Sequence, residues 1–370
     1  MSFDDGLMLG LMLGGDGGGS GGDEKWHLPE NWIPIPEPGQ KQIVMLIEIA
    51  KGSENNINNP ALAFGSQYDI EGIGSIDWGD GYIDIVSQEK SQEHSGRYTH
   101  IYSQAGLYII TITLPVYISG SFFFTSPSTA HVSGDMFPGG EAIYTFTTMQ
   151  TAKTGWVRAI KLGNDAYVSN NVMSTDFGQF GGLVYLKYCG NSFDYVSDKR
   201  GLHTSNRGLC KIDFENLPTE IPESMCASCY SLKEADFVRN VKDIPNSAFS
   251  NCYGLKSVDL SSAETLGTNA FSLCYQLKEI NAPKVTSIAN AFSNCFGLRK
   301  ILASSLLSLP TGMFTNFAYN IVWIDTPSLI DVPSGVLNNF SSLQKFTYAN
   351  NCDFHGYNFL ANYNLYPKPE

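Results

Sequence analysis

Cysteines are the residues of this chain with the greatest potential for chemistry, and their spacing limits what they can do. Cys226 and Cys229 are separated by two residues, a spacing found in zinc sites and in dithiol redox centres. However, Cys229, Cys252, Cys274 and Cys295 recur at steps of 23, 22 and 21 residues, each three residues before a leucine. A period of this length is typical of a solenoid, in which equivalent positions stack on one another. We therefore interpret these four residues, the cysteine ladder, as a repeated core position.

Each repeat combines two patterns of different period. Residues 244–260 read Ile-Pro-Asn-Ser-Ala-Phe-Ser-Asn-Cys-Tyr-Gly-Leu-Lys-Ser-Val-Asp-Leu, and the copies at 269–280 and 290–301 differ little from them. The Ala-Phe-Ser-Asn-Cys stretch places Phe and Cys three residues apart, as one buried helical turn requires, whereas the following Leu-x-x-Val-x-Leu alternates like a short strand. We therefore expect parallel strands on one side of each coil, with short helical turns and loops on the other.

The inward residue of each strand extends the array beyond the cysteine ladder, to about nine strands. In this alignment Cys226 takes the position of Phe249, while Phe317 and Phe340 take the position of the ladder cysteines. Cys226 and Cys229 are therefore expected to lie in the core as free thiols, although stacking also brings ladder cysteines within disulfide range. The inward anchors are Ile160, Leu186, Ile212, Ala235, Val258, Ile280, Ile301, Ile324 and Phe346.

These residues resemble the leucine-rich repeats of the BspA-like class, whose unit has the form I-P-x-x-A-F-x-x-C-x-x-L-x-x-I. The resemblance covers residues 155–352 and is most specific from 221 to 301. It implies a solenoid, and it implies a bacterial or bacteriophage surface protein that recognises proteins, matrix or glycans without catalysis.

A second resemblance lies upstream of the repeats. Residues 76–81 read Ile-Asp-Trp-Gly-Asp-Gly, and they are followed by His-Ile-Tyr at 100–102 and by Gly-Leu-Tyr-Ile-Ile-Thr-Ile at 106–112. These three blocks are similar, in order, to blocks of PKD domains. The resemblance implies an immunoglobulin-like β-sandwich over residues 41–118 with a spacing or docking role, and it implies a packing role for His100.

The remaining candidates for chemistry are histidines and carboxylates. The six histidines form no H-E-x-x-H or H-x-H pattern. Asp77 and Asp80 suit a tight turn in which their carboxylates accept backbone N–H bonds, with calcium binding as the alternative. We therefore expect a protein that is not an enzyme and that has no cofactor or metal site.

The predicted fold is mainly β with short helices, an immunoglobulin-like (PKD-like) β-sandwich followed by a leucine-rich-repeat solenoid. A content of 36 glycines and 16% charged residues agrees with β-rich, loop-rich structure. The expected segments are an apolar plug and Gly-rich tether at 1–22, a Pro-rich linker at 23–40, the β-sandwich at 41–118, a connector at 119–154, the repeats at 155–352 and an aromatic C-terminal cap at 353–370.

Charge and hydropathy restrict the partners. A net charge of -13 offers no basic patch to a nucleic-acid backbone. The apolar stretch at 7–13 is far shorter than the roughly 20 residues of a membrane-spanning helix, and Asp4 and Asp5 stand where a signal peptide has basic residues. We expect this stretch to be a docking peptide toward other virion proteins, formed by Leu7, Met8, Leu9, Leu11, Met12 and Leu13.

The residues beside each inward anchor form the predicted recognition surface. Alternation along a strand directs them away from the core, and aromatic or apolar residues among polar neighbours, such as Trp323, Leu302 and Tyr185, are typical of binding surfaces. A merely solvated sheet face is the alternative. The candidate ligand-binding residues are Tyr185, Lys187, Asp236, Asp259, Asn281, Lys300, Leu302, Trp323, Asp325 and Lys345.

From these features we expect a non-catalytic attachment protein, displayed on a phage virion, that presents its repeats to a host-surface protein or glycan. The lack of a recognisable export signal favours a virion over a bacterial cell surface. A bacterial cell-surface adhesin of the BspA-like type and a purely structural virion decoration protein remain the alternatives.

Overall fold

A computed structural model describes residues 26–51, 61–64, 70–93, 97–115, 117–118, 121–125, 145–148, 157–164, 182–190, 205–288, 290–311, 320–338 and 340–356. The chain divides into two compact units, which we call the N-terminal unit (residues 27–216) and the C-terminal unit (residues 217–370 with residues 1–26). The expected docking peptide, the tether and most of the expected cap lie outside the described residues. Within these ranges no helix has the length and apolarity needed to cross a membrane.

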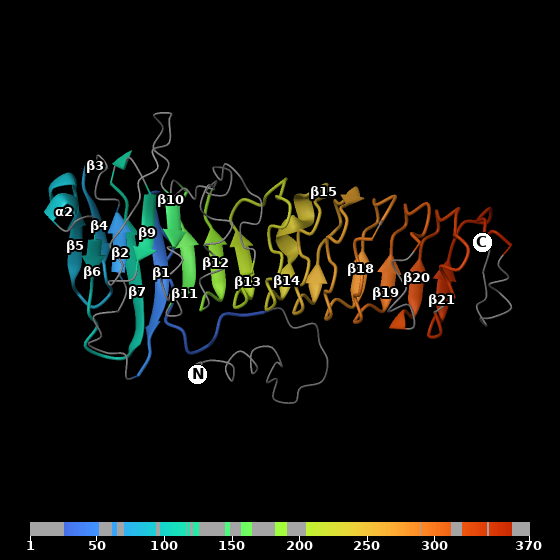
Figure 1. Ribbon diagram of the computed structural model, residues 1–370, viewed down its shortest axis with the longest axis horizontal. Coiled ribbons are helices and arrows are strands. Elements are labelled where there is room, and N and C mark those ends of the chain that lie inside the picture. The colour runs from blue at the N-terminus through green and yellow to red at the C-terminus, as the bar shows by residue number, and fades with distance from the viewer. Residues whose placement is uncertain are drawn as a thin grey trace. The chain divides into compact units, whose positions relative to one another are not determined.

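Where the structure describes it, the N-terminal unit consists of strands and one short helix (Figure 1). Its elements are β1 (Gln42–Ile49), β2 (Ala61–Phe64), β3 (Ile70–Glu71), β4 (Gly74–Asp77), β5 (Ile83–Val86), α2 (Gln88–Glu93), β6 (Arg97–Thr99), β7 (Gly106–Thr113), β8 (Tyr117–Ile118), β9 (Ser121–Thr125), β10 (Thr145–Thr148), β11 (Val157–Leu162), β12 (Tyr185–Tyr188) and β13 (Lys211–Phe214). They form a seven-stranded sheet of order β13-β12-β11-β1-β7-β4-β5, a four-stranded sheet of order β10-β9-β2-β6, and a β3-β8 pair.

The seven-stranded sheet is mixed, and it includes the first strands of the repeat array. β1 pairs antiparallel with β7 on one side and with β11 on the other, and β11, β12 and β13 then run parallel. One buried apolar row crosses this sheet in register, through Ile110, Met45, Ile160, Leu186 and Ile212. The first three predicted anchors are therefore confirmed as core residues.

Residues 119–154, which the sequence suggested as a connector, supply two strands of the four-stranded sheet. β9 pairs antiparallel with β2, and β10 pairs in parallel with β9. The Ser-Phe-Phe-Phe-Thr sequence of β9 is rich in the aromatic residues that favour strands. The boundary between the two compact units falls after Asn216.

The C-terminal unit is a solenoid of short parallel strands (Figure 1). Its elements are β14 (Glu234–Ala235), the 3-10 helix η2 (Asp236–Asn240), β15 (Asp243–Ile244), β16 (Ser257–Val258), β17 (Thr265–Leu266), β18 (Glu279–Asn281), β19 (Lys300–Leu302), β20 (Trp323–Asp325) and β21 (Lys345–Thr347). β14 pairs with β16, β15 with β17, and β18 to β21 form one four-stranded sheet.

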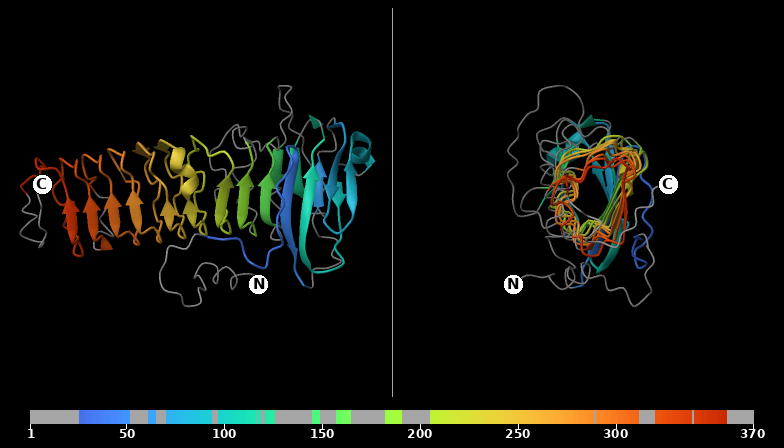
Figure 2. Two further views of the ribbon diagram at one scale, coloured as in Figure 1. Left: turned by 180° about the vertical axis from the view of Figure 1, so that it is seen from behind. Right: turned by 90° about the vertical axis from the view of Figure 1, so that its right-hand side faces the viewer.

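The core of this unit consists of equivalent residues stacked from coil to coil. The end-on view in Figure 2 superposes the successive coils as a ring of chain. The predicted anchors Ile280, Ile301, Ile324 and Phe346 are register partners in neighbouring strands and are all buried. Fully buried phenylalanine rings also stack face to face, with centroid distances of 5.4 Å and 5.2 Å, in the order Phe249, Phe271 and Phe292.

The Ala-Phe-Ser-Asn-Cys stretches form single turns, each closed by a bond over three residues such as that from the Cys252 N–H to the Phe249 carbonyl at 3.3 Å. They do not continue as helices, because left-handed residues such as Ser247 (φ 54°) and Asn251 (φ 60°) interrupt a right-handed helix. Backbone N–H groups bond alternately within the turn, as from Ser250 to the Ser247 carbonyl at 3.1 Å, and to the next coil, as from Phe249 to the Ala270 carbonyl at 2.8 Å. Bonds within the turns and bonds between repeats therefore share the backbone groups of these stretches.

The cysteines confirm the prediction of free thiols, and they have a second function in the core. All eight are free; Cys352 is partly exposed and the other seven are buried. The thiols of Cys252, Cys274 and Cys295 donate to the backbone carbonyls of Cys226, Phe249 and Phe271 in the preceding coil, at 3.1, 3.3 and 3.0 Å. Burial raises the pKa of Cys295 to about 12, so this thiol keeps the proton that it donates. Cys252, Cys274 and Cys295 are thus small apolar residues that also satisfy a buried carbonyl.

Candidate recognition surface

The sheet β18–β21 brings the outward residues of four repeats together on one face. Each of these side chains is next to a buried anchor, so the alternation of the strand directs it away from the core. One register row contains Glu279, Lys300, Trp323 and Lys345, and the second contains Asn281, Leu302, Asp325 and Thr347. We call these eight residues the open face.

Trp323 is the centre of the open face and has a lysine from each neighbouring strand beside its ring. The Lys345 Nζ lies 4.2 Å and the Lys300 Nζ 5.5 Å from the ring centroid. Lys300 also forms an ion pair of 3.2 Å with Glu279, whereas Lys345 is exposed and has no carboxylate partner among the described residues. The Trp323 indole N–H is enclosed and lacks an acceptor within the same residues. This arrangement combines an aromatic ring with an unneutralised cation.

Six of the ten predicted ligand-binding residues meet on the open face, and two others of the C-terminal unit do not. Strands β14 and β16 contain only two residues each. Asp236 therefore begins η2, and Asp259 follows its strand and accepts the N–H of Ser261 in a turn, at 3.0 Å. The six that meet are Asn281, Lys300, Leu302, Trp323, Asp325 and Lys345.

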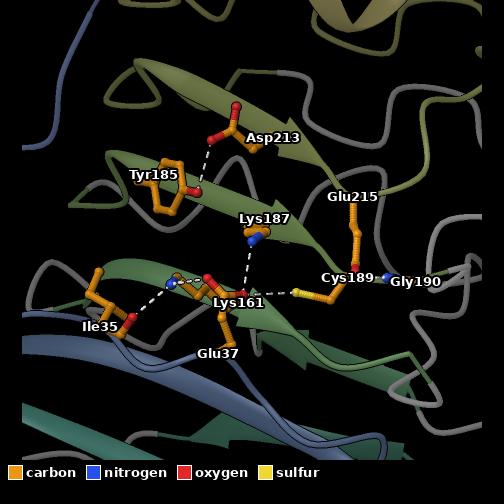
Figure 3. A network of polar contacts seen from close by, with 9 residues as sticks. All are labelled: Ile35, Glu37, Lys161, Tyr185, Lys187, Cys189, Gly190, Asp213 and Glu215. Atoms are coloured by element: carbon orange, nitrogen blue, oxygen red, sulfur yellow. Dashed lines mark hydrogen bonds and ion pairs between the residues drawn. The ribbon is translucent and has the colours of Figure 1, made fainter.

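The other two predicted residues, Tyr185 and Lys187, are on the equivalent outward side of β12 but are covered. Only 5% of Tyr185 is exposed, and its hydroxyl donates to Asp213 Oδ2 at 2.9 Å. The Lys187 Nζ binds Glu37 Oε2 at 2.8 Å. The expectation that Tyr185 is exposed is therefore wrong, because another segment of the N-terminal unit lies over this side of the sheet (Figure 3).

The covering segment is held by Lys161, which lies on the neighbouring strand β11. Lys161 is 6% exposed, and its Nζ donates to the Ile35 carbonyl at 2.7 Å and to Glu37 Oε1 at 2.9 Å. The Cys189 thiol adds a weak contact of 3.7 Å to the other Glu37 oxygen. We call the outward residues of β11–β13, together with this contact to residues 35–37, the covered face (Figure 3).

Charge stabilises the covered face. Partial burial opposes ionisation of Glu37, but the hydrogen bonds and charges of Lys187 and Lys161 prevail and lower its pKa to about 2. Burial, followed by the nearby charge of Asp213, raises the pKa of Tyr185, so its hydroxyl stays a donor. Each ionised group in this network has a partner, and the network acts as a structural contact.

The residues of the PKD-like blocks form a compact cluster in the N-terminal unit. Asp77 Oδ1 accepts the Gly79 N–H at 2.9 Å, and Asp80 Oδ1 accepts the Tyr82 N–H at 3.2 Å, which confirms the predicted turn capping. His100 Nε2 lies 2.7 Å from Asp80 Oδ2, and its ring stacks on Trp78 with a centroid distance of 5.2 Å. Only 11% of the His100 side chain is exposed, so a packing role is also confirmed.

A polar group near the end of the repeats contains the residue types of a catalytic triad. The Ser308 hydroxyl donates to Asp331 Oδ2 at 2.5 Å, and His355 Nε2 lies 2.8 Å from Asp331 Oδ1. The serine thus contacts the carboxylate instead of the imidazole that would have to accept its proton. Among the described residues, moreover, no group of three or more His, Cys, Asp or Glu side chains is arranged to hold a metal ion.

The aromatic residues that directly follow the ladder cysteines in the sequence stack on one another. The sequence pattern contains this signal, but the stack was not predicted from it. Centroid distances are 4.6, 4.8 and 5.6 Å along Tyr230, Tyr253, Tyr275 and Phe296. Because the rings stack on one another, their faces are occupied and mainly their edges are left for solvent.

Comparison with known proteins assigns the repeats. Residues 204–320 and 264–366 match the family model of the BspA type Leucine rich repeat region, in 6 copies. A search of curated proteins finds no match. The C-terminal unit is mainly a solenoid, and the matched residues 204–366 are similar to BspA-type leucine-rich repeats.

Solved structures of leucine-rich repeat proteins show a distant likeness. One from Bacteroides ovatus ATCC 8483 has 22% identity and a TM-score of 0.38, over 53% of this chain and 49% of that chain. The T. pallidum Leucine Rich Repeat protein has 16% identity and a TM-score of 0.30, over 50% and 82%. A leucine rich cell surface protein from Faecalibacterium prausnitzii A2-165 has 13% identity and a TM-score of 0.17, over 62% and 91%. The chain thus spans about half the length of the first of these structures, and its repeat region is similar to the BspA type Leucine rich repeat region.

Proposed function

We propose that this protein is a non-catalytic recognition protein that binds its ligand through the open face of the repeats. The observation that carries the proposal is the cluster of Lys300, Trp323 and Lys345 on one face of the sheet. An aromatic side chain among polar neighbours is the usual energetic centre of a binding surface. Repeats of this kind present surfaces built for contact rather than chemistry.

The setting we propose is a bacterial cell surface, as in an adhesin of the BspA-like type. The match of residues 204–366 to BspA-type repeats supports this setting. The virion setting expected from the sequence depended on the first residues of the chain, which lie outside the described residues, and no comparison supports it. Virion display of the same binding surface is therefore the less favoured proposal.

For residues 41–118 we propose a PKD-like, immunoglobulin-like fold with a spacing or docking role. The support is the cluster in which Trp78, Asp80, His100 and Tyr102 contact one another. Tyr102 donates its hydroxyl hydrogen to the Trp78 carbonyl at 2.8 Å and packs edge-on against His100. These contacts give a packing reason for the W-G-D-G and H-x-Y blocks.

The recognition proposal is tested by binding of the full chain to a panel of immobilised matrix proteins, glycans and synthetic peptides. Trp323→Ala should remove binding while leaving the thermal unfolding midpoint of the repeats nearly unchanged. Tyr275→Ala is the matched control, because Tyr275 is an exposed aromatic of the same unit that is not part of the open face. Unchanged binding by the Trp323→Ala variant would refute the proposal.

A further inference from the structure

The covered face shows how the outward positions of this protein receive a peptide. Residues 34–38 read Pro-Ile-Pro-Glu-Pro, and alternating prolines favour an extended chain with carbonyls free for other donors. Two contacts fasten this segment: the Ile35 carbonyl accepts from Lys161, and the Glu37 carboxylate accepts from both Lys161 and Lys187. An extended acidic peptide is therefore bound here by lysines of neighbouring strands.

The open face presents a comparable set of side chains. Lys161, Tyr185 and Lys187 are outward residues of two neighbouring strands in the covered face. Lys300, Trp323 and Lys345 are outward residues of three neighbouring strands in the open face. Each set consists of one aromatic residue and two lysines. The difference is that the covered lysines share the carboxylate of Glu37, whereas Lys345 has no carboxylate among the described residues.

We propose that the open face binds an extended, proline-containing acidic peptide segment of a partner protein. A carboxylate of the peptide is bound by Lys345 and Lys300, and a proline or aliphatic residue packs beside Trp323. This inference rests on the proposed recognition function and names its ligand class. Charge complementarity supports it, because an ammonium without a counter-charge attracts an anion, and the charge on a peptide carboxylate can be held between two lysines.

The position of the lysines favours an acidic peptide over a neutral sugar. A sugar stacks on the open face of an aromatic ring, but the Lys345 Nζ already lies 4.2 Å from the Trp323 centroid. A neutral sugar would have to displace this ammonium and lose its cation–π attraction. A carboxylate instead binds the ammonium where it is. The nearby aromatic stack offers no better sugar platform, because its ring faces pack against one another.

The test uses the full chain and a labelled synthetic peptide with the sequence of residues 31–40, Asn-Trp-Ile-Pro-Ile-Pro-Glu-Pro-Gly-Gln. Fluorescence anisotropy should show saturable binding that weakens as the salt concentration rises, because salt screens exposed charges. A peptide with Gln in place of its Glu should bind about tenfold more weakly or worse, as the loss of one charge-assisted contact predicts.

Protein variants locate the site. Trp323→Ala and Lys345→Gln should each weaken peptide binding at least about tenfold, whereas Lys256→Gln, which removes an exposed lysine outside the open face, should have no effect. Dependence on Trp323 also separates this binding from exchange of the peptide onto the covered face. Absence of binding, or binding that ignores Trp323 and Lys345, would overturn the inference.

Two other outcomes would indicate a different ligand of the open face. If a glycan of the panel binds in a Trp323-dependent way and no acidic peptide does, the peptide inference fails and the recognition function stands. If the chain self-associates through the open face, seen in sedimentation as a dimer lost in Trp323→Ala, the occupant is a second copy and the partner-protein assignment fails. If nothing binds in a Trp323-dependent way, both the inference and the proposed function fail.

Discussion

The covered face and the open face use the same kind of outward strand position, yet one is occupied and the other is free. In the N-terminal unit Lys161 is buried beneath residues 35–37, and Tyr185 is buried with its hydroxyl on Asp213. In the C-terminal unit Lys345 is exposed and Trp323 is only partly buried. Alternation along a strand therefore determines which side of the sheet a residue points to, whereas its exposure depends on which other segments the fold places over that side.

The two faces also use their lysines differently. Lys161 is charged and almost fully buried, so it requires the Ile35 carbonyl and the Glu37 carboxylate as partners. Lys345 is exposed to water, so folding does not require such a partner for it. Lysines of the covered face should therefore stabilise the protein, and those of the open face should serve binding.

The same substitution in both faces gives the strongest test of this comparison. Lys161→Gln should lower the free energy of unfolding by about 1–3 kcal/mol, because it removes charged hydrogen bonds from a buried position. Lys345→Gln should change it by less than about 0.5 kcal/mol, as is usual for surface residues. Urea unfolding of the full chain measures both. Equal effects of the two variants would break the distinction between the faces.

Acid should weaken the covered face selectively. The pKa of Glu37 is lowered from 4.5 to about 2 in the folded protein. Its contribution to stability is therefore complete above 4.5 and is lost as the pH falls toward 2. Hydrogen exchange of the β11 and β12 amides should speed up over this interval in the natural chain and change much less in Glu37→Gln. A pH profile shared by both proteins would count against the role of Glu37.

A smaller effect is expected from the tyrosine of the covered face. Tyr185→Phe removes the hydroxyl that donates to Asp213 Oδ2 at 2.9 Å and leaves the ring in place. The expected loss is about 1 kcal/mol of unfolding free energy, because Asp213 Oδ2 loses this donor while the contact of Asp213 to Lys211 at 3.7 Å remains. Trp323→Phe, the matched change on the open face, should leave stability within about 0.5 kcal/mol and weaken ligand binding. A stability loss in the second variant alone would reverse the comparison.

The smallest expected effect concerns the repeats themselves. Leu273 has φ of 63°, and the equivalent positions of neighbouring repeats are Asn251 and Asn294. Because asparagine tolerates this conformation better than leucine, Leu273→Asn should stabilise the C-terminal unit by about 0.5–1 kcal/mol. Thermal unfolding measures the gain, and peptide binding at the open face should not change. A loss of stability would mean that the contacts of the leucine side chain outweigh the backbone strain.

Much of the repeat architecture was predictable because its signals are local and recur. The period of the cysteine ladder and the inward anchors follow from the spacing of apolar residues, and the register of β18–β21 agrees with them. The Phe–Cys spacing predicted one turn, but not that left-handed residues such as Asn251 and bonds between coils stop this turn from continuing as a helix. The thiol bonds of the ladder also required the coil-to-coil stacking to be seen.

By itself, the sequence determined the repeat, eight of the nine inward anchors and the six predicted residues of the open face, since each follows from a short period repeated many times. Only the tertiary structure decided which outward residues are available. The cover over Lys161 comes from Glu37, which is 124 residues away in the chain. A period in the sequence does not indicate such a contact, because the contact depends on where the fold places a separate segment and on the charge of that segment.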